Sequence, residues 1–257
     1  MIRAIVFDLF DTLVDQNHER LAPVEIEGRK VGATTPALHA YLREQSGLAL
    51  SLGDFADRLG GVDGELRKET IDQGIELPTL DRFTALATHL ECDEVLSVAA
   101  GLTEIHMGAL REAATTPLHH EAVLTTLASE YKLGVCSNFT HAASARSVLA
   151  VDGLDQHMSS IVISEEIGIR KPRREIFEAV IDSLDVPAGE ILHVGDSLSA
   201  DVAGAAAMGM KTLWLTRQIR DPERDFAKYA GPRPDVSIED LMDLPVTAAR
   251  FSSIGRR

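Results

Sequence analysis

Short apolar runs recur along the chain, and each ends at a polar residue. These runs, expected as strands, are residues 2–7, 132–136, 161–163, 190–195 and 211–215. Runs that are apolar throughout are typical of strands buried on both faces of a parallel sheet. Helix-length segments separate the later runs, at residues 140–151, 175–184 and 199–208. This alternation predicts an α/β fold, a doubly wound parallel-sheet core of the Rossmann-like kind.

The pattern changes between residues 17 and 117, where helix formers dominate and strand-like runs disappear. We therefore expect an all-helical cap domain at 17–117, inserted after the first strand into a catalytic core formed by 1–16 and 118–257. Ligands of doubly wound sheets bind at the carboxyl edge of the strands, which is where the insertion begins. The segment is expected to close over the active site. The alternative is a second domain without catalytic contact.

Polar residues at the ends of the predicted strands are the candidates for chemistry. Asp8, Ser137 and Asp196 each stand directly after or at the end of such a run, so a parallel sheet would bring them to one edge. Lys171 precedes Pro172, which disfavours helical geometry at the lysine and places it on a loop before a helix. Asp8 alone would be more typical of a turn or a helix cap. Together they predict an active site.

Four segments, in order, resemble the motifs of the haloacid dehalogenase superfamily. They are FDLFDTL at 7–13, CSN at 136–138, IGIRKP at 167–172 and GDSLSAD at 195–201. The resemblance covers the whole predicted core, whereas the cap is similar only in its position and helical character. It implies a hydrolase of this superfamily, of the subfamily whose helical cap follows the first strand.

The resemblance also implies roles for particular side chains. Asp8 would be the nucleophile that forms a covalent aspartyl intermediate. Ser137, with backbone donors beside Asn138, would hold a phosphoryl oxygen, and Lys171 would neutralise Asp8 and the substrate as charge develops. Thr12 would brace the loop that carries Asp8.

A magnesium site is implied in the same way. Asp8 and Asp196 would bind Mg²⁺, the backbone carbonyl of Phe10 would be the third protein ligand, and Asp201 would lie nearby or bridge through water. Few carboxylates, retained waters and a substrate oxygen suit Mg²⁺.

Phe10 departs from the phosphatases of the superfamily, which carry a second Asp at this position as general acid and base. Losing such a group commonly costs about 10² to 10⁴ in rate. Asp11 follows, but adjacent positions point in different directions, so we do not expect it to substitute. The expected function remains a Mg²⁺-dependent phosphatase acting on a phosphoric monoester or an acyl phosphate.

Three alternatives stay open. In a metal-independent 2-haloacid dehalogenase an aromatic at Phe10 is expected, because halide leaves without a proton, but those enzymes carry neutral residues where Asp196 stands. A phosphonate-cleaving enzyme needs a Schiff-base lysine in the cap, and neither Lys30 nor Lys68, the lysines of the cap, has a sequence context that indicates one. A catalytically silent binding protein on the same fold would have little reason to keep Asp8, Lys171 and Asp196.

Charge narrows the choice of partners. The 257 residues hold 25 Lys and Arg against 40 Asp and Glu, a formal charge of −15, which disfavours nucleic acid and anionic membranes as partners. A small anionic, phosphorylated substrate is expected. Two cysteines give no disulfide framework, and the amino-terminal run is too short for a signal peptide or a membrane span, so we expect a cytoplasmic protein. The sequence does not predict the oligomeric state.

Overall fold

The computed structural model describes residues 1–253. The chain divides into two compact units, one formed by Met1–Asp15 with Thr116–Arg257 and the other by Gln16–Thr115. These divisions lie next to the boundaries expected from the sequence. The last residues of the expected core, 254–257, lie outside the described part.

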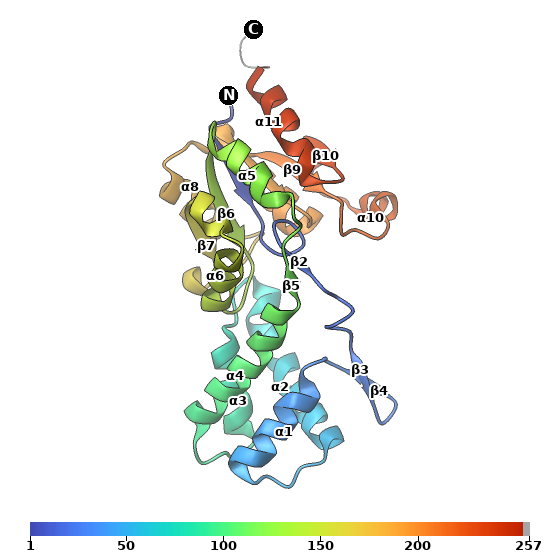
Figure 1. Cartoon of the computed structure of the whole chain (residues 1–257). Coiled ribbons are helices and arrows are strands. Elements are labelled where there is room, and N and C mark those ends of the chain that lie inside the picture. Colours follow the sequence, from blue (N-terminus) through green and yellow to red (C-terminus); the bar gives the residue numbers. More distant parts are fainter. Residues whose placement is uncertain (254–257) are drawn as a thin grey trace. The chain divides into compact units, whose positions relative to one another are not determined.

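A six-stranded parallel sheet organises the first unit (Figure 1). Its strands, in spatial order, are β10 (Val236–Ile238), β9 (Lys211–Leu215), β8 (Ile191–Gly195), β1 (Ala4–Phe7), β6 (Lys132–Ser137) and β7 (Met158–Ile163). The chain builds the sheet outward from β1 in one direction and then in the other. This order confirms the doubly wound α/β fold, and it places the ends of β8, β1 and β6 side by side.

Helices cover both faces of this sheet, as strands without an exposed face require. Ala4 and Val6 share an apolar cluster with α8 (Arg174–Leu184). Ile5 and Phe7, which alternate with them along β1, are also fully buried. α5 (His120–Ala128) packs against β6, and α11 (Leu244–Ser253) packs against α5.

The remaining helical elements of this unit are short, and one differs from the expected helix at 199–208. They are α6 (Ala142–Val151), η2 (Leu154–His157), α7 (Ser164–Ile167), η3 (Ala188–Glu190), η4 (Leu198–Val202), α9 (Ala203–Ala207), α10 (Pro222–Lys228) and η5 (Leu241–Asp243). The helix begins as the π-helical turn η4 and becomes α-helical only at α9. Gly209 lies just beyond it with φ 78°, the left-handed conformation that favours glycine after a helix.

The second unit is mainly helical and has its own core. Its helices are α1 (Thr35–Ser46), α2 (Leu52–Glu69), η1 (Ile71–Gln73), α3 (Thr79–His89) and α4 (Val95–Glu112) (Figure 1). Phe55, Phe83 and Leu102 are fully buried among them. The short strands β2 (Asp15–Gln16) and β5 (Ala114–Thr115) pair where the chain enters and leaves this unit. Among the described helices of both units, none is long and apolar enough to cross a membrane.

A hairpin corrects the expectation of an all-helical insertion. β3 (Val24–Ile26) and β4 (Arg29–Val31) pair antiparallel across a two-residue turn. Glu27 and Gly28 in this turn have φ of 50° and 77°, and positive φ at both positions is what a tight hairpin turn needs. Glu at the first turn position is not one of the usual signals, which is why the sequence pattern did not reveal the hairpin.

Candidate active site

Asp8 stands at the carboxyl end of the central strand β1. Its backbone N–H donates to the carbonyl of Val194 on β8 at 2.9 Å, so the strand pairing continues to the residue itself. Asp196 directly follows β8, and Ser137 ends β6. The structure therefore brings these three predicted site residues to adjoining strand ends.

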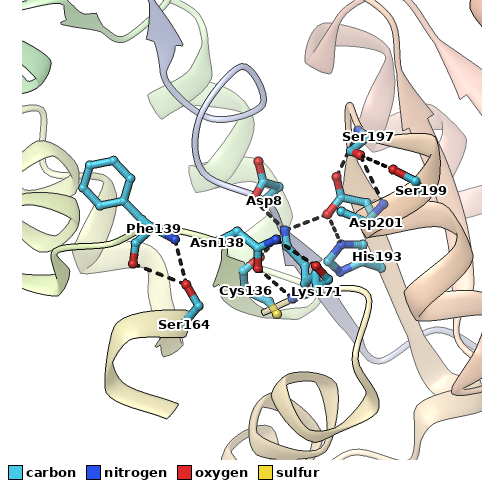
Figure 2. Close-up of polar contacts among 11 residues, drawn as sticks. Asp8, Cys136, Asn138, Phe139, Ser164, Lys171, His193, Ser197, Ser199 and Asp201 are labelled. Carbon is cyan, nitrogen blue, oxygen red and sulfur yellow. Dashed lines mark hydrogen bonds and ion pairs between the residues drawn. The ribbon is translucent and has the colours of Figure 1, made fainter. Parts of the chain in front are cut away.

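The ammonium of Lys171 lies between two carboxylates (Figure 2). Its Nζ donates to Asp8 Oδ1, to Asp201 Oδ1 and to the Cys136 carbonyl, each at 2.6 Å. The side chain is 1% exposed. Burial alone would lower the pKa of Lys171, but Asp201 and Asp8 raise it above its usual range. Lys171 is therefore a fixed positive charge.

Asp201 holds Lys171 from the other side. Its Oδ1 also accepts from His193 Nε2 at 3.0 Å, and its Oδ2 accepts from the Ser197 N–H at 3.0 Å. Burial opposes ionisation, yet Lys171 and His193 together keep the pKa of Asp201 well below its usual range. Since both oxygens already have protein donors, Asp201 is suited to positioning Lys171.

The carboxylates of Asp8, Asp196 and Asp201 form a cluster. One oxygen from each lies within 4.8 Å of the others. Burial, then repulsion by Asp8 and Asp201, raises the pKa of Asp196 to about 8, and burial also raises the pKa of Asp8. Clustered oxygen ligands with unrelieved repulsion suit a hard divalent cation. The Phe10 carbonyl as a third ligand stays a prediction.

Two contacts fix the surroundings of Asp196. Its backbone carbonyl accepts from the indole Nε1 of Trp214, on β9, at 2.7 Å. The neighbouring Gly195 has no room for a side chain, because a Cβ there would lie 2.3 Å from Asp201 Cγ. Glycine therefore lets the Asp201 carboxyl reach the end of β8.

Asn138 clamps the lysine loop rather than pointing only toward a substrate. Its Nδ2 donates to the Lys171 carbonyl at 3.0 Å, and its Oδ1 accepts from the Lys171 N–H at 2.7 Å. The next residue is also fixed, because the Phe139 N–H donates to Ser164 Oγ at 2.8 Å and Ser164 Oγ donates back to the Phe139 carbonyl at 3.3 Å (Figure 2). The loop after β6 is thus tied to two other segments of the core.

The loop after Asp8 carries an aromatic residue, Phe10, in place of the second carboxylate expected of a phosphatase. The ring of Phe10 packs on Phe139, with centroids 4.6 Å apart and planes tilted by 37°. Asp11 has a left-handed backbone with φ 59°, and its charge contributes to the raised pKa of Asp196. Thr12 is fully buried, and its Oγ1 has no hydrogen-bond partner within the described residues. Its bracing role stays a prediction.

Sequence reasoning missed several residues that build the site. These are His193, Phe139, Ser164 and the carbonyl of Cys136. His193 left a signal, because a histidine inside an otherwise apolar strand needs a buried polar partner. The other three act through contacts between segments distant in the sequence, which the spacing of the motifs does not specify.

Comparisons with known proteins identify the family to which the chain is similar. A family model described as haloacid dehalogenase-like hydrolase matches residues 2–209. A glyceraldehyde 3-phosphate phosphatase of Pyrococcus abyssi is 28% identical over 84% of this chain and 82% of its own. A phosphoserine phosphatase of Thermus thermophilus is 27% identical, covering 95% and 98%. An (S)-2-haloacid dehalogenase of Burkholderia cepacia is 26% identical, covering 88% of each.

Among solved structures, a 2-haloacid dehalogenase from Pseudomonas syringae pv. tomato superimposes with a TM-score of 0.74. It is 24% identical and covers 98% of this chain and 100% of its own. At that identity the match bears on the fold, and it agrees with the doubly wound architecture.

Proposed function

The chain belongs to the haloacid dehalogenase-like hydrolases, and from this premise we propose that it is a Mg²⁺-dependent phosphatase with Asp8 as nucleophile. Its substrate would be a small phosphoric monoester or acyl phosphate. The phosphatase names of two relatives that match most of the chain support this class. Because another relative is a dehalogenase, the names of the relatives do not decide between the two activities, and the proposal rests on the site.

The carboxylate cluster is the observation that carries the proposal. Asp8, Asp196 and Asp201 face one another across less than 4.8 Å, and Lys171 supplies one positive charge among them. The site would have a net negative charge and would repel an anionic substrate unless a cation were bound in the site. Burial, and then repulsion by Asp8 and Asp201, raises the pKa of Asp196 to about 8, and a cation bound between these acids would offset their charge.

Asp8 would perform the bond-making step. A carboxylate oxygen attacks phosphorus, the bond from phosphorus to the leaving oxygen breaks, and an aspartyl phosphate remains on Asp8. Water then attacks this phosphorus, releasing phosphate and the free carboxylate. Lys171, held by Asp201 and by the Asn138 clamp, would stabilise the charge that develops at Asp8 and on the phosphoryl oxygens. Ser137 would donate to one of those oxygens.

Asp8 and Asp196 would hold Mg²⁺, with the Phe10 carbonyl and Asp201 as further predicted contributors. When bound, Mg²⁺ would offset the charge of the carboxylates and of the phosphoryl group. The protein's own contribution is the rigid placement of the two acids at adjoining strand ends, where Asp8 is fixed by Val194 and Asp196 by Trp214.

The inserted unit, expected at residues 17–117, would act as the cap. It is a compact body with its own core and enters the chain just after the nucleophile loop. Such lids exclude water and bind the distal part of a substrate. Arg29 and Lys30 in the β3–β4 hairpin are candidate contacts for a distal anionic group, although Arg29 is engaged by Asp57.

A second candidate function is 2-haloacid dehalogenation. The Phe10–Phe139 ring pair favours it, because an apolar wall suits a halide that leaves without a proton. The same Asp8 would then form a carbon ester. Half-buried Asp196 counts against it, since a third acid beside Asp8 and Asp201 adds no group that would bind a substrate carboxylate and suits a site that holds a cation.

One substrate panel separates the candidates. Phosphorylated metabolites and 2-haloacids would each be assayed with Mg²⁺ and with chelator. We expect phosphate release that needs Mg²⁺ and stops in Asp8→Asn, because an amide cannot form the covalent ester. The matched control is Asp182→Asn, an exposed acid on α8, which should keep full activity.

Other results would redirect the assignment. Turnover of 2-chloropropionate in chelator would establish the dehalogenase. Substantial phosphatase activity in Asp8→Asn would refute the nucleophile. Absence of any covalent intermediate with every substrate would favour the silent binding protein.

A further inference from the structure

Two histidines and an acid meet on the catalytic unit outside the Asp8 site. His119 and His120 begin α5, and Asp240 precedes η5. One side-chain ligand atom from each lies within 4.8 Å of the others. His119 Nε2 and Asp240 Oδ1 are 2.7 Å apart, and the two imidazole rings meet edge to face with centroids 4.7 Å apart. None of the proposed catalytic steps uses these groups.

His120 is the unusual member of the group. Its side chain is fully buried, and its Nδ1 lies 2.8 Å from the carbonyl of Leu13. A carbonyl only accepts, so Nδ1 carries the proton and Nε2 presents a lone pair. Nε2 is buried and has no hydrogen-bond partner in the described part of the chain. Burial lowers the pKa of this imidazole, with Arg217 and His119 adding to the effect, which keeps the ring neutral.

This is the arrangement that metal-binding histidines adopt. One ring nitrogen is oriented by a backbone carbonyl, and the other is left free for the ion. Neutral imidazoles with one carboxylate suit a borderline transition-metal ion better than Mg²⁺, which prefers oxygen ligands. We propose that His119, His120 and Asp240 form a second metal site, selective for an ion of the zinc class.

Access and charge agree with this proposal. The side chains of His119 and Asp240 are 31% and 32% exposed, so an ion can enter from solvent while His120 forms the floor. Arg217 lies nearby, with Nε 3.9 Å from Asp240 Oδ2, but its two terminal nitrogens are paired with the carboxylate of Asp15. That pairing offsets the guanidinium charge. The ion would lie between His119 Nε2 and Asp240 Oδ1, and the neutral imidazole would then carry its proton on Nδ1.

The bound ion would tie three segments together. His119 and His120 fix the start of α5, Asp240 fixes the start of η5, and the contact with Leu13 reaches the loop that carries Thr12 and follows Asp8. The bound ion would therefore link these segments, and solvent would complete its coordination.

The test is a titration of the full chain with Co²⁺ and then Zn²⁺, in the Asp196→Asn background. That substitution weakens metal binding at the Asp8 site, whose ligands are all oxygens. Co²⁺ bound by imidazoles at low coordination number absorbs visible light far more strongly than octahedral Co²⁺ bound by oxygens, so the visible band reports the histidine site. We expect a visible band that saturates at one equivalent and is displaced by Zn²⁺. His119→Gln, which can still donate to Asp240, and Asp240→Asn should each weaken Zn²⁺ binding by more than about tenfold.

The matched control is His89→Gln, an exposed histidine on α3 that should leave the titration unchanged. The same titration of the unmodified chain in saturating Mg²⁺ covers the case in which Asp196→Asn does not fold. Failure of the chain to bind Zn²⁺ at micromolar free ion would overturn the proposal. Undiminished binding in both His119→Gln and Asp240→Asn would do the same. Neither result depends on whether the Asp8 site is a phosphatase.

Discussion

At the Asp8 site the ammonium of Lys171 forms ion pairs with two carboxylates. Lys171 is 1% exposed and uses its three N–H groups on Asp8, Asp201 and the Cys136 carbonyl. Removing one partner of a buried ion pair typically costs about 3–5 kcal/mol, because the other charge stays buried and uncompensated. Changes at Asp201 should therefore disturb both stability and the position of Lys171. Within the described part of the chain, Lys171 pairs with Asp8 and Asp201 but the Asp196 side chain forms no ion pair.

We expect the metal-free protein to lose stability as the pH rises. The pKa of Asp196 is about 8 in the folded protein against an ordinary 3.8. Between these values the folded state keeps a proton that the unfolded chain releases, so the free energy of unfolding falls with increasing pH. Urea denaturation in chelator across this range would measure the slope.

Asp196→Asn should reduce that slope, and added Mg²⁺ should restore stability mainly at the high-pH end, because it binds the ionised form. Some slope should remain in the variant, since the pKa of Asp8 is raised as well. A slope unaffected by Asp196→Asn would contradict the assignment.

Phe10 should make the phosphatase sensitive to its leaving group. Without a proton donor the departing oxygen carries its own charge, so aryl and acyl phosphates should react much faster than alkyl phosphates. Phe10→Asp should raise alkyl phosphate turnover by about 10² or more and flatten this dependence. First-step rates across a substrate series are the appropriate measurement.

Phe10→Ala is the control for that variant, because it removes the ring from Phe139 without adding an acid. If the unmodified protein already shows no leaving-group dependence, another acid is at work. Asp11 would be the first to test, since its charge is felt at Asp196.

At the scale of elements, the sequence predicted strands well where apolar runs were continuous. β1, β6, β8 and β9 lie within the expected ranges or one residue from them. β7 begins at Met158, before its apolar run, because backbone pairing with β6 extends into a polar stretch. β10 is a three-residue edge strand, too short to give a periodic signal. The bounds of β7 and the presence of β10 depend on the strands with which they pair, and these lie in other segments of the chain.

In the candidate site, too, some contacts could be predicted from the sequence and others could not. Strand ends are fixed by topology, so the approach of Asp8, Ser137 and Asp196 could be predicted. The hydrogen bonds of Asn138 to Lys171 and of His193 to Asp201 could not, because they depend on side-chain directions in loops and inside a strand.

Gly195→Ala should disrupt the end of β8. The new Cβ would lie 2.3 Å from Asp201 Cγ, and Asp201 cannot move without breaking its bonds to Lys171 and Ser197. Overpacking of this kind typically costs about 1–3 kcal/mol, and turnover should fall with it. The control is Gly189→Ala, whose nearest neighbour would be 4.0 Å away. Urea denaturation and initial rates would compare the two variants, and equal behaviour would refute the steric role of Gly195.

At the scale of the whole molecule, each unit has an apolar cluster of its own among the described residues. Phe55 and Phe83 belong to a cluster in the inserted unit, and Phe177 belongs to one in the sheet-containing unit. Each unit buries its own apolar side chains, so each has the means to unfold as its own cooperative segment.

We expect Phe55→Ala and Phe177→Ala to act on different units. Each removes a fully buried ring and should cost about 3–5 kcal/mol. Native-state hydrogen exchange should show lost protection in α1 to α4 for Phe55→Ala, and in the sheet and α8 for Phe177→Ala. Equal loss in both units for either variant would mean that the cores unfold together.

Trp214 gives the protein a built-in optical reporter. It is the single tryptophan of the chain, and its indole donates to the backbone carbonyl of the proposed metal ligand Asp196 while stacking on Phe226 at 5.9 Å. Indole emission responds to hydrogen bonding and to nearby charge. Unlabelled protein should therefore report cation binding at Asp196 as a change in fluorescence, and stopped-flow mixing could follow the arrival of the ion separately from the chemistry.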